Sequence, residues 1–396
     1  MRVADLRTFV VGNPPPSHGG RYFVFLTLTT DDGVKGVGEV YAATFHPRAL
    51  EAMISDVFER HVAGADPFAI ERLTRQIAAR GYSGRPDLSL MGVMSGIEMA
   101  CWDIVGKALG RPVHDLLGGR VHERLRAYTY LYAEPGDPVD VYTDPDLAAE
   151  RAAAYLAQGF TALKFDPLGP YSAFDPRQPS LEALARTEAY VERVRDAVGD
   201  SCDLLIGTHG QLTPAGAVRL ARRLERFDPL WLEEPVPPES PEQMAVVARA
   251  TSIPIATGER LTTKHEFARV LATRAAAILQ PNLGRVGGLL EGKKIAALAE
   301  AHYAQIAPHL YCGPVVGAAN IQLAACSPNF LVLEGIGRWD GFHAELLRRP
   351  IRWEDGFVIP PTEPGLGVEL DEDVAARHPY EGDELHLTPL DVSVVG

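Results

Sequence analysis

The feature that most constrains the fold is a regular alternation of short apolar runs with amphipathic helical stretches, which extends from about residue 124 to residue 335. Between most of the runs lies a helical pattern, as at 213–227 and 288–302. Strands that alternate with helices pair in parallel, and eight such units predict a closed barrel. The eight runs are 127–132 (AYTYLY), 161–165 (TALKF), 203–207 (DLLIG), 230–234 (LWLEE), 254–259 (PIATGE), 276–281 (AAILQP), 305–309 (QIAPH) and 330–335 (FLVLEG).

The two ends of the chain predict a smaller α+β unit. Residues 21–30 and 34–41 are expected to form two strands joined by the turn Asp31-Asp32-Gly33, and helical patterns follow at 47–62, 66–79 and 95–109. The C-terminal stretch is rich in Pro and Gly and is expected to return to this unit. The predicted fold is therefore an α/β, TIM-type barrel of seven or eight β/α units with an α+β capping domain. Its parts are the N-terminal capping domain 1–123, the barrel 124–351 and the C-terminal segment 352–396.

The charge and the cysteines restrict the partners. The chain has 38 Lys and Arg against 52 Asp and Glu, a net charge of −14, which argues against nucleic acid or an anionic membrane as a partner. The four cysteines form no CxxC pair, so we expect reduced thiols in a cytoplasmic protein without a zinc framework. The N-terminus lacks the pattern of a signal peptide, and no apolar stretch suggests a transmembrane helix.

Polar side chains follow the predicted strands at the end where barrel enzymes carry their active sites. Glu233 and Glu259 end consecutive strands, and two carboxylates that converge in this way suit Mg²⁺ better than zinc. The alternative is that each Glu pairs with a neighbouring Arg, such as Arg260. The residues at the strand ends are Lys164, Asp166, His209, Glu233, Glu259, Asn282, His309 and Glu334.

Two of these side chains suggest proton transfer. His309 is a candidate general base because the pKa of an imidazole lies near neutral pH, although a lone His here could be structural. Lys164 ends an otherwise apolar strand, where partial desolvation beside a metal would lower its pKa and allow it to shuttle protons. Its alternative role is a salt bridge to Asp166 or Glu233.

Several motifs resemble the enolase superfamily, in its mandelate racemase/muconate lactonizing enzyme-like branch, over nearly the full chain. The N-terminal unit resembles the capping domain of that family at DDGVKGVGE (31–39) and SGIEMACWDIVGKALGRPVHDLLGG (95–119). The barrel resembles it, in the same order, at LEEP (232–235), ATGER (256–260), LQPNLGRVGG (279–288) and APHLYCGP (307–314).

This resemblance implies removal of the proton alpha to a carboxylate, with one Mg²⁺ that stabilises an enediolate. It implies that Glu233 and Glu259 bind the metal and that His309 is the base. Lys164 would be the acid/base of the second strand, and Glu334 would hydrogen-bond the substrate carboxylate or the enediolate. The implied partner is a small carboxylate, with neither nucleic acid nor membrane, and family members usually form homo-oligomers.

The chain departs from the family pattern at the third metal ligand, which is normally an acid that ends strand three. Gly207 stands at that position in IGTHGQ (206–211). Asp166, where the family often has a second Lys, could supply the missing oxygen, and His209 could instead bind through nitrogen. Asp166 is favoured because Mg²⁺ prefers oxygen, and the remaining alternative is a site that binds metal weakly or not at all.

Two further departures concern the base and an additional acid. Asn282 replaces the Asp that usually orients the base; its side-chain oxygen could still fix the tautomer of His309, which should be a weaker base without the charge. His209 lies two residues beyond the strand-three position, as in the sugar-acid (galactonate-type) dehydratases of the family, where it expels the β-hydroxyl group. The motif LTP (212–214) adds to that likeness.

Three functions remain open from the sequence. The first is dehydration of a sugar acid to a 2-keto-3-deoxy acid, a lyase reaction that the additional acid His209 favours. The second is an isomerase, either a racemase or epimerase that uses Lys164 and His309, or a sugar-lactone cycloisomerase. The third is a non-catalytic member that binds an acid sugar. The substrate itself is expected to depend on the loops 12–22 and 80–90, with His18, Arg21, Tyr41, Tyr82 and Arg85 as polar candidates, and on Tyr171 and Arg177 after strand two.

Overall fold

The computed structural model describes residues 1–42, 45–79 and 87–387, and each of the eight apolar runs contains a strand. The predicted runs are mostly longer than the strands because their last residues leave the sheet and enter the loops. The strands are β4 (Leu125–Tyr130), β5 (Ala162–Phe165), β6 (Asp203–Gly207), β7 (Trp231–Glu233), β8 (Ile255–Thr257), β9 (Ile278–Leu279), β10 (Gln305–Ile306) and β11 (Leu333–Glu334).

These strands close into a parallel barrel. Consecutive strands pair in parallel from β4 to β10. Strand β10 then joins the last strand through a parallel bridge between Ile306 and Phe330, and β11 pairs in parallel with β4, with Leu333 opposite Ala127. The predicted TIM-type barrel is therefore confirmed, and its first and last strands are neighbours.

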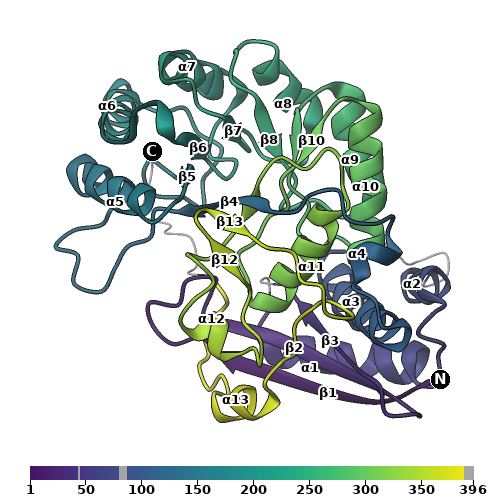
Figure 1. Cartoon of the computed structure of the whole chain (residues 1–396). Helices are drawn as coiled ribbons and strands as arrows, with labels where there is room; N and C mark the ends of the chain where they lie inside the picture. The colour runs from purple at the N-terminus through teal and green to yellow at the C-terminus, as the bar shows by residue number, and fades with distance from the viewer. Residues whose placement is uncertain (43–44, 80–86, 388–396) are drawn as a thin grey trace.

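Seven helices connect the strands and cover the outside of the barrel (Figure 1). Pro stands in the first turn of four of them, where its fixed φ suits a helix start and its missing N–H is not needed. The helices are α5 (Pro145–Ala157), α6 (Leu181–Val198), α7 (Pro214–Leu224), α8 (Pro241–Ala248), α9 (Thr263–Thr273), α10 (Leu289–Ala301) and α11 (Pro314–Ala325).

The inside of the barrel is filled by one layer of side chains, to which each strand or its flank contributes one residue. Tyr128 and Trp231 pack edge to face in this layer, with ring centroids 5.4 Å apart. Because side chains alternate along a strand, the residue two positions further on points to the same interior. The layer consists of Tyr128, Ala162, Leu205, Trp231, Ala256, Ile278, Ala307 and Val332.

The N-terminal unit is a three-stranded antiparallel sheet with helices packed on it. It contains the two predicted strands and an additional first strand that the sequence did not predict. Its elements are β1 (Val3–Gly12), β2 (Tyr22–Thr30), β3 (Lys35–Val40), α1 (Pro47–Val57), a π-helical turn (Phe58–Val62), α2 (Ile70–Ala78), α3 (Leu88–Leu109) and α4 (Val113–Leu116).

The glycines of β3 allow α3 to lie directly on the sheet. A Cβ on Gly38 would stand 1.8 Å from the carbonyl oxygen of Gly96, and one on Gly36 would stand 2.1 Å from that of Ala100. Helix α3 starts earlier than predicted, because the side chain of Asp87 accepts hydrogen bonds from the N–H groups of Ser89 and Leu90 and caps it there.

Helix α3 also corrects one expectation. It has 22 residues with a mean hydropathy of 1.4 over its most apolar window, so by length and composition it could cross a membrane. However, 89% of that window is buried inside the protein. A buried core helix has the same composition, and this helix packs between the sheet of the capping domain and the barrel.

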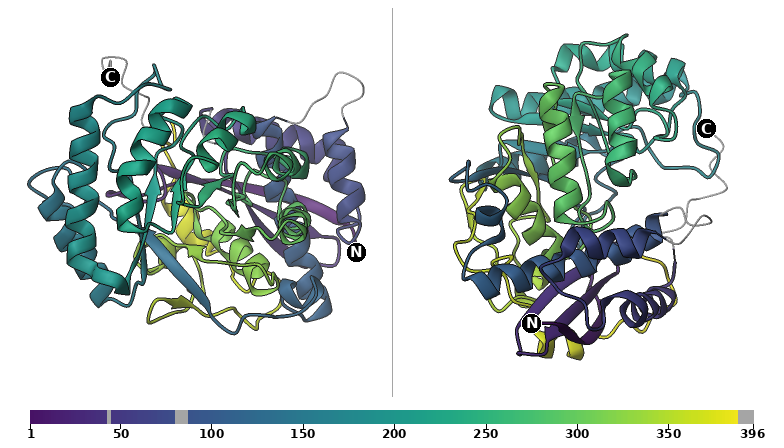
Figure 2. Two further views of the ribbon diagram at one scale, coloured as in Figure 1. Left: turned by 90° about the horizontal axis from the view of Figure 1, so that it is seen from above. Right: turned by 90° about the vertical axis from the view of Figure 1, so that its right-hand side faces the viewer.

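The C-terminal segment lies against both parts of the molecule, as Figures 1 and 2 show. After α12 (Phe342–Glu345), the hairpin of β12 (Trp353–Glu354) and β13 (Phe357–Val358) pairs antiparallel with β4. Beyond α13 (Glu372–Arg377), Tyr380 donates its N–H to the carbonyl of Val10 in β1. The chain thus returns to the capping domain as expected, whereas the domain boundaries at 123/124 and 351/352 stay predictions.

Two buried carboxylates of the capping domain bind the starts of barrel helices. Glu39 accepts hydrogen bonds from the N–H groups of Gly313, Val315 and Val316 at the start of α11, at 2.5–3.1 Å. In the same way Glu98 accepts hydrogen bonds from Leu289 and Leu290 at the start of α10, both at 2.8 Å. Helix N-termini favour negative charge, so these contacts fix the capping domain over the end of the barrel.

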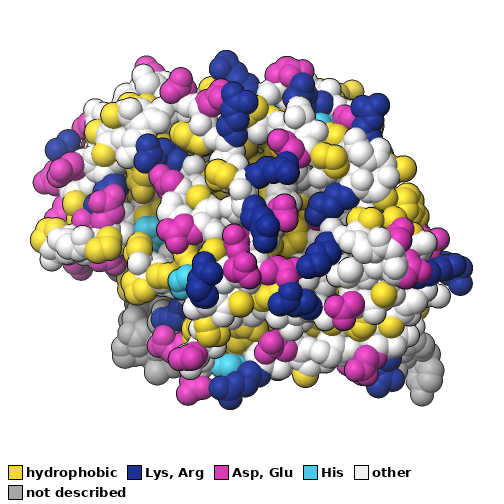
Figure 3. Space-filling view, turned by 60° about the horizontal axis from the view of Figure 1, so that its bottom comes forward, with side chains coloured by type: hydrophobic (Ala, Val, Ile, Leu, Met, Phe, Trp, Pro, Cys, Tyr) yellow, Lys and Arg dark blue, Asp and Glu magenta, His cyan; other side chains and the backbone are white. Residues whose placement is uncertain are grey.

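The surface in Figure 3 carries Lys and Arg side chains interspersed with Asp and Glu. A nucleic-acid-binding face usually shows a continuous basic patch instead. This face therefore adds nothing to the case for a nucleic-acid partner, which the net charge of −14 already opposes.

Glu39 generates a prediction about stability. Burial raises its pKa from 4.5 to about 7, so the folded protein binds this proton more tightly than the unfolded chain. The free energy of unfolding should therefore fall as the pH rises from about 4.5 to about 7, by up to about 3 kcal/mol from this group. In Glu39→Gln this part of the pH dependence should disappear, which urea denaturation at pH 5, 6 and 7 measures.

The matched control is Glu150→Gln, on the exposed face of α5, which should keep the wild-type slope. A Glu39→Gln protein whose free energy of unfolding varies with pH as steeply as that of the wild type would contradict the assignment.

Candidate active site

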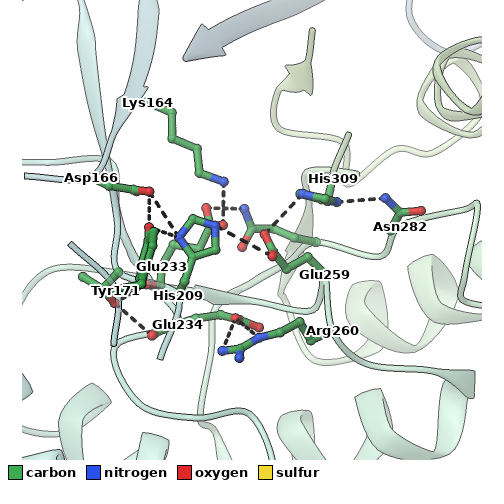
Figure 4. Close-up of polar contacts among 12 residues, drawn as sticks. Lys164, Asp166, Tyr171, His209, Glu233, Glu234, Glu259, Arg260, Asn282 and His309 are labelled. Carbon is green, nitrogen blue, oxygen red and sulfur yellow. Dashed lines mark hydrogen bonds and ion pairs between the residues drawn. The ribbon is translucent and has the colours of Figure 1, made fainter. Parts of the chain in front are cut away.

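The predicted strand-end residues meet at the C-terminal end of the barrel. Figure 4 shows how most of them point toward one another, namely Lys164, Asp166, His209, Glu233, Glu259, Asn282 and His309. The side chains of Lys164, Glu233 and Glu334 lie on the same interior faces as the apolar layer, each two residues beyond one of its members. The Lys164 ammonium lies 2.5 Å from Glu233 Oε1 and 3.7 Å from Glu334 Oε1, and all three side chains are buried. The salt bridge to Glu233 is thus present.

The pKa of Lys164 differs from the expectation. Burial alone would lower it, but the carboxylates of Glu233 and Glu334, and then that of Glu259, outweigh this effect and raise it above its usual value. Burial also raises the pKa of Glu233, and the nearby ammonium of Lys164 acts in the opposite direction. Without a bound metal, Lys164 is therefore positively charged. It is not the neutral amine that the sequence analysis expected from desolvation.

Asp166 occupies the space that the side chain at position 207 leaves free. A Cβ on Gly207 would lie 1.9 Å from Asp166 Oδ1. Gly207 is the interior position of β6, two residues beyond Leu205, so a ligand on strand three would have to project from it. The carboxylate of Asp166 therefore stands where that side chain would be, which fits the prediction that it replaces the missing ligand.

Asp166 is joined to His209 directly and through Tyr171. His209 Nδ1 lies 3.2 Å from Asp166 Oδ2, and the Tyr171 hydroxyl makes short contacts with both the carboxylate and the imidazole. Burial lowers the pKa of His209, but the carboxylates of Asp166 and Glu259 outweigh it and raise the pKa to about 9. His209 is therefore protonated at neutral pH and can act as an acid.

His209 also has a positive φ of 44°. Positive φ is uncommon for residues other than Gly, although His adopts it more often than most, and such conformations often occur at functional sites. Because its hydroxyl contacts both Asp166 and His209, Tyr171 covers the site as suggested. Arg177, on the same insert, instead pairs with Asp175 at 2.8 Å.

His309 is buried and contacts Asn282, but not as the sequence suggested. The side-chain oxygen of Asn282 accepts a hydrogen bond from the N–H of Gly284 at 2.8 Å, so its amide nitrogen faces His309 Nδ1, also at 2.8 Å. An amide nitrogen can only donate, which places the proton of a neutral His309 on Nε2. The expectation that the oxygen of Asn282 fixes the tautomer was therefore wrong, because Gly284 already uses that oxygen.

The carboxylate of Glu259 lies between the two histidines. His309 Nε2 is 3.3 Å from its Oε2, and His209 Nε2 is 3.9 Å from its Oε1. Burial lowers the pKa of His309; the carboxylates of Glu259 and Glu334 act in the opposite direction but do not outweigh it, so the pKa stays below its usual value and this histidine is neutral. The site thus holds a protonated and a neutral imidazole on either side of one carboxylate.

Arg260 does not pair with either predicted ligand. It binds the buried Glu234 at 2.7 Å, which leaves Glu233 and Glu259 directed into the barrel mouth. The sequence analysis also missed Gln280, which donates to Glu233 Oε2 at 2.7 Å. The same two-residue spacing, counted from Ile278, would have identified Gln280 as an interior residue.

The carboxylates of Asp166, Glu233 and Glu259 suit a divalent cation, although they are not arranged as a complete coordination site. Within the described ranges, no group of three His, Cys, Asp or Glu side chains is placed to hold a metal. However, Asp166 Oδ1 and Glu259 Oε2 are buried and accept no hydrogen bond, and a buried acceptor of this kind usually has a partner. A metal held by these oxygens and by Glu233 would require Glu233 to move away from Lys164 and Gln280.

The capping-domain loops supply part of the wall. His18 stacks on Tyr132 at the end of β4, with ring centroids 4.1 Å apart, and Tyr41 lies 6.3 Å from the His309 ring. Arg21 pairs with Glu384 of the C-terminal segment at 2.9 Å. Tyr82 and Arg85 lie outside the described residues.

Comparison with known proteins agrees with this architecture. Residues 16–118 match the mandelate racemase / muconate lactonizing enzyme N-terminal domain, and residues 147–374 match the enolase C-terminal domain-like family. A D-galactonate dehydratase of Verminephrobacter eiseniae is 36% identical, with 94% of this chain and 93% of that protein covered. A D-xylonate dehydratase of Haloferax volcanii is 33% identical, with coverage of 97% and 90%.

Solved structures agree as well. One from Labrenzia alexandrii DFL-11 is 64% identical, with a TM-score of 0.96 and coverage of 99% of this chain and all of that one. A mandelate racemase/muconate lactonizing enzyme from Sulfitobacter sp. is 53% identical, with a TM-score of 0.95 and the same coverage. The chain therefore belongs to the enolase superfamily, in its mandelate racemase/muconate lactonizing enzyme branch.

Proposed function

We propose that the protein is a lyase that dehydrates a sugar acid to a 2-keto-3-deoxy acid. The observation that carries this proposal is the position of two histidines on either side of Glu259, with His209 Nε2 3.9 Å and His309 Nε2 3.3 Å from its carboxylate oxygens; the surrounding charges raise the pKa of His209, and burial lowers that of His309. Two titratable groups whose pKa values are pushed apart suit an acid and a base. The dehydratase names of the relatives from V. eiseniae and H. volcanii support the same reaction class.

In the proposed reaction His309 Nε2 takes the proton from the carbon alpha to the carboxylate. The electron pair of that C–H bond moves into the carboxylate and gives an enediolate, toward which Lys164 directs its positive charge. When the carboxylate re-forms, the bond between the β-carbon and its hydroxyl oxygen breaks, and His209 donates the proton that turns this hydroxyl into water. The remaining enol tautomerises to the 2-keto acid.

Before it can accept the proton, His309 must free Nε2. Reversal of the Asn282 amide would turn its oxygen toward Nδ1 and move the ring proton there, but the N–H of Gly284 would lose its acceptor. A buried N–H without a partner costs about 1–3 kcal/mol. His309 therefore works as a base only against this cost, which agrees with the weak base that the sequence predicted.

One Mg²⁺ is the cofactor that the family generally uses, and Glu233, Glu259 and Asp166 are the residues that would hold it. When bound, it supplies positive charge that stabilises the enediolate. Glu334 Oε1 is buried and accepts no hydrogen bond, so a carboxyl group of the substrate that carries a proton, or a hydroxyl group, can donate to it.

Isomerisation is the second candidate. Lys164 and His309 both lie at the C-terminal end of the barrel and could serve as the two bases of a racemase or epimerase. Opening of a sugar lactone would need only one of them. The protonation states weigh against racemisation, since the carboxylates keep Lys164 charged. The third candidate, a non-catalytic binder of acid sugars, would be favoured by a metal-free site in which Asp166 pairs with Lys164, but Lys164 pairs with Glu233 and Asp166 contacts His209 and Tyr171. We also propose that the enzyme is cytoplasmic and forms a homo-oligomer, as its family membership implies.

The metal site can be tested by moving a ligand between strands. Asp166→Ala should weaken Mg²⁺ binding about 10- to 100-fold, since an oxygen ligand is lost. Adding Gly207→Asp should restore most of the affinity, because the space that Asp166 fills would then be free for the new carboxylate. Isothermal titration calorimetry with Mg²⁺ measures both effects.

Asp200→Ala, at an exposed position after α6, serves as the control. Unchanged Mg²⁺ affinity in Asp166→Ala would remove Asp166 from the ligand set and leave His209 as the remaining candidate.

The dehydration can be tested with Mg²⁺ and a panel of hexonates, pentonates, aldarates and their lactones, assayed for 2-keto acids. His209→Asn should lower product formation about 100-fold or more, the size of a lost general acid, while exchange of the α-proton in D₂O continues. The control His265→Asn changes an exposed residue of α9 and should behave as wild type. Opening of a lactone with no keto acid from any acid would refute dehydration and favour the cycloisomerase.

The base can be tested at Asn282. In Asn282→Asp, a carboxylate oxygen faces His309 Nδ1 and favours a proton there, so we expect α-proton exchange in D₂O to rise about tenfold. His309→Asn should abolish the exchange. Exchange that survives His309→Asn, or that falls in Asn282→Asp, would assign the base to Lys164.

A further inference from the structure

Arg285 is a buried cation without a carboxylate partner beside the catalytic residues. It lies in the loop between β9 and α10, and its side chain is about nine-tenths buried. Its Nη1 donates to the backbone carbonyl of Glu259 at 3.2 Å, whereas its Nε is buried without a hydrogen-bond partner. The ion pairs found among the described residues do not include Arg285.

The capping domain fixes the position of this guanidinium. Its Cζ lies 4.0 Å from the ring centroid of Tyr41, and the N–H of Tyr41 donates to the carbonyl of Gly284 at 3.0 Å. Since the Tyr41 ring is in turn 6.3 Å from that of His309, Arg285 stands at the capping-domain side of the proposed base.

The groups that would bind the reacting carboxylate lie toward the barrel. Lys164 and Glu334 lie there, each two residues beyond a member of the interior layer, with Lys164 Nζ 3.7 Å from Glu334 Oε1. A sugar acid whose reacting end lay between Lys164 and His309 and whose other end extended toward the capping domain would reach Arg285.

His386 of the C-terminal segment also lies at this place with unused hydrogen-bonding atoms. Its ring packs edge-on against Tyr41, with centroids 5.2 Å apart, and both of its ring nitrogens are buried without a hydrogen-bond partner. The guanidinium Nε and the protonated ring nitrogen of a neutral His386 can thus each donate a hydrogen bond to a polar group near the same tyrosine.

A buried charge is retained when a partner compensates it. One neutral carbonyl and the face of one tyrosine compensate the Arg285 charge only in part. A carboxylate matches a guanidinium through two parallel hydrogen bonds, which is the geometry that Arg provides and Lys does not.

We propose that Arg285 binds a second carboxylate at the far end of the substrate, so that the preferred substrate is an aldarate, a sugar acid with a carboxylate at each end. This inference rests on the proposed dehydration and names its substrate class. It distinguishes this chain from relatives named for D-galactonate and D-xylonate, which carry one carboxylate.

The test compares galactarate with D-galactonate, because the two acids differ only at C6, which is a carboxylate in the first and a hydroxymethyl group in the second. The wild type should show a kcat/KM for galactarate at least about tenfold higher. Arg285→Met should lower this value about 100-fold while changing that for galactonate by less than about threefold. Arg285→Lys, which keeps the charge, should lie between the two proteins.

Arg269→Met is the control, at an exposed arginine of α9 that pairs with Glu242, and it should leave both values unchanged. A wild type that prefers galactonate overturns the inference, and so does an Arg285→Met protein that loses both activities equally with an unchanged melting temperature. If Arg285→Met does not fold, the inference is tested by the preference of the wild type for galactarate over galactonate and by the reduction of that preference in Arg285→Lys.

If neither acid is dehydrated, the proposed function fails, and the same proteins are compared by calorimetric titration with the two acids. Tighter binding of galactarate that Arg285→Met abolishes would then support the Arg285 site alone. Equal affinities for galactarate and galactonate would refute the inference as well.

Discussion

The contact on which the rest of the molecule depends is that between the Glu39 carboxylate and the start of α11. Three backbone N–H groups bind one buried side chain of the capping domain, four to seven residues after His309. The loop that carries His309 and the strand that leads to Tyr41 are therefore held by the same residue. Glu98 repeats this arrangement at α10, which follows the loop of Asn282 and Arg285. Each half of the pocket is thus tied to the capping domain through a helix start.

Most of the fold could be predicted because it follows from periodicity. An apolar strand every few tens of residues leaves few alternatives to a closed barrel, and all eight runs contain a strand. The site residues could be predicted for the same reason, since side chains at Lys164, Glu233 and Glu334 continue the interior face of their strands. The first strand of the capping domain was missed because β1 alternates irregularly between exposed and buried residues.

The orientation and the protonation of the site residues could not be predicted, because they depend on contacts that no sequence pattern indicates. The orientation of the Asn282 amide follows from the N–H of Gly284, which takes its oxygen. The charge of Lys164 follows from the carboxylates of Glu233 on β7, Glu334 on β11 and Glu259 in the loop after β8, and the proton on His209 follows from Asp166, which comes from a different β/α unit. The charge of Lys164 and the proton on His209 are electrostatic balances between residues far apart in the sequence, so desolvation alone gave the wrong sign for Lys164.

The exchange of roles between Gly207 and Asp166 has a mechanical consequence. In a barrel, neighbouring strands can shift slightly relative to one another, and a site assembled from several strands changes its internal spacing when they do. Lys164 lies in β5, and Asp166 is the first residue after it. The ammonium and the carboxylate are therefore carried by one backbone segment, so a shift of β5 relative to the other strands moves both relative to Glu233 and Glu259.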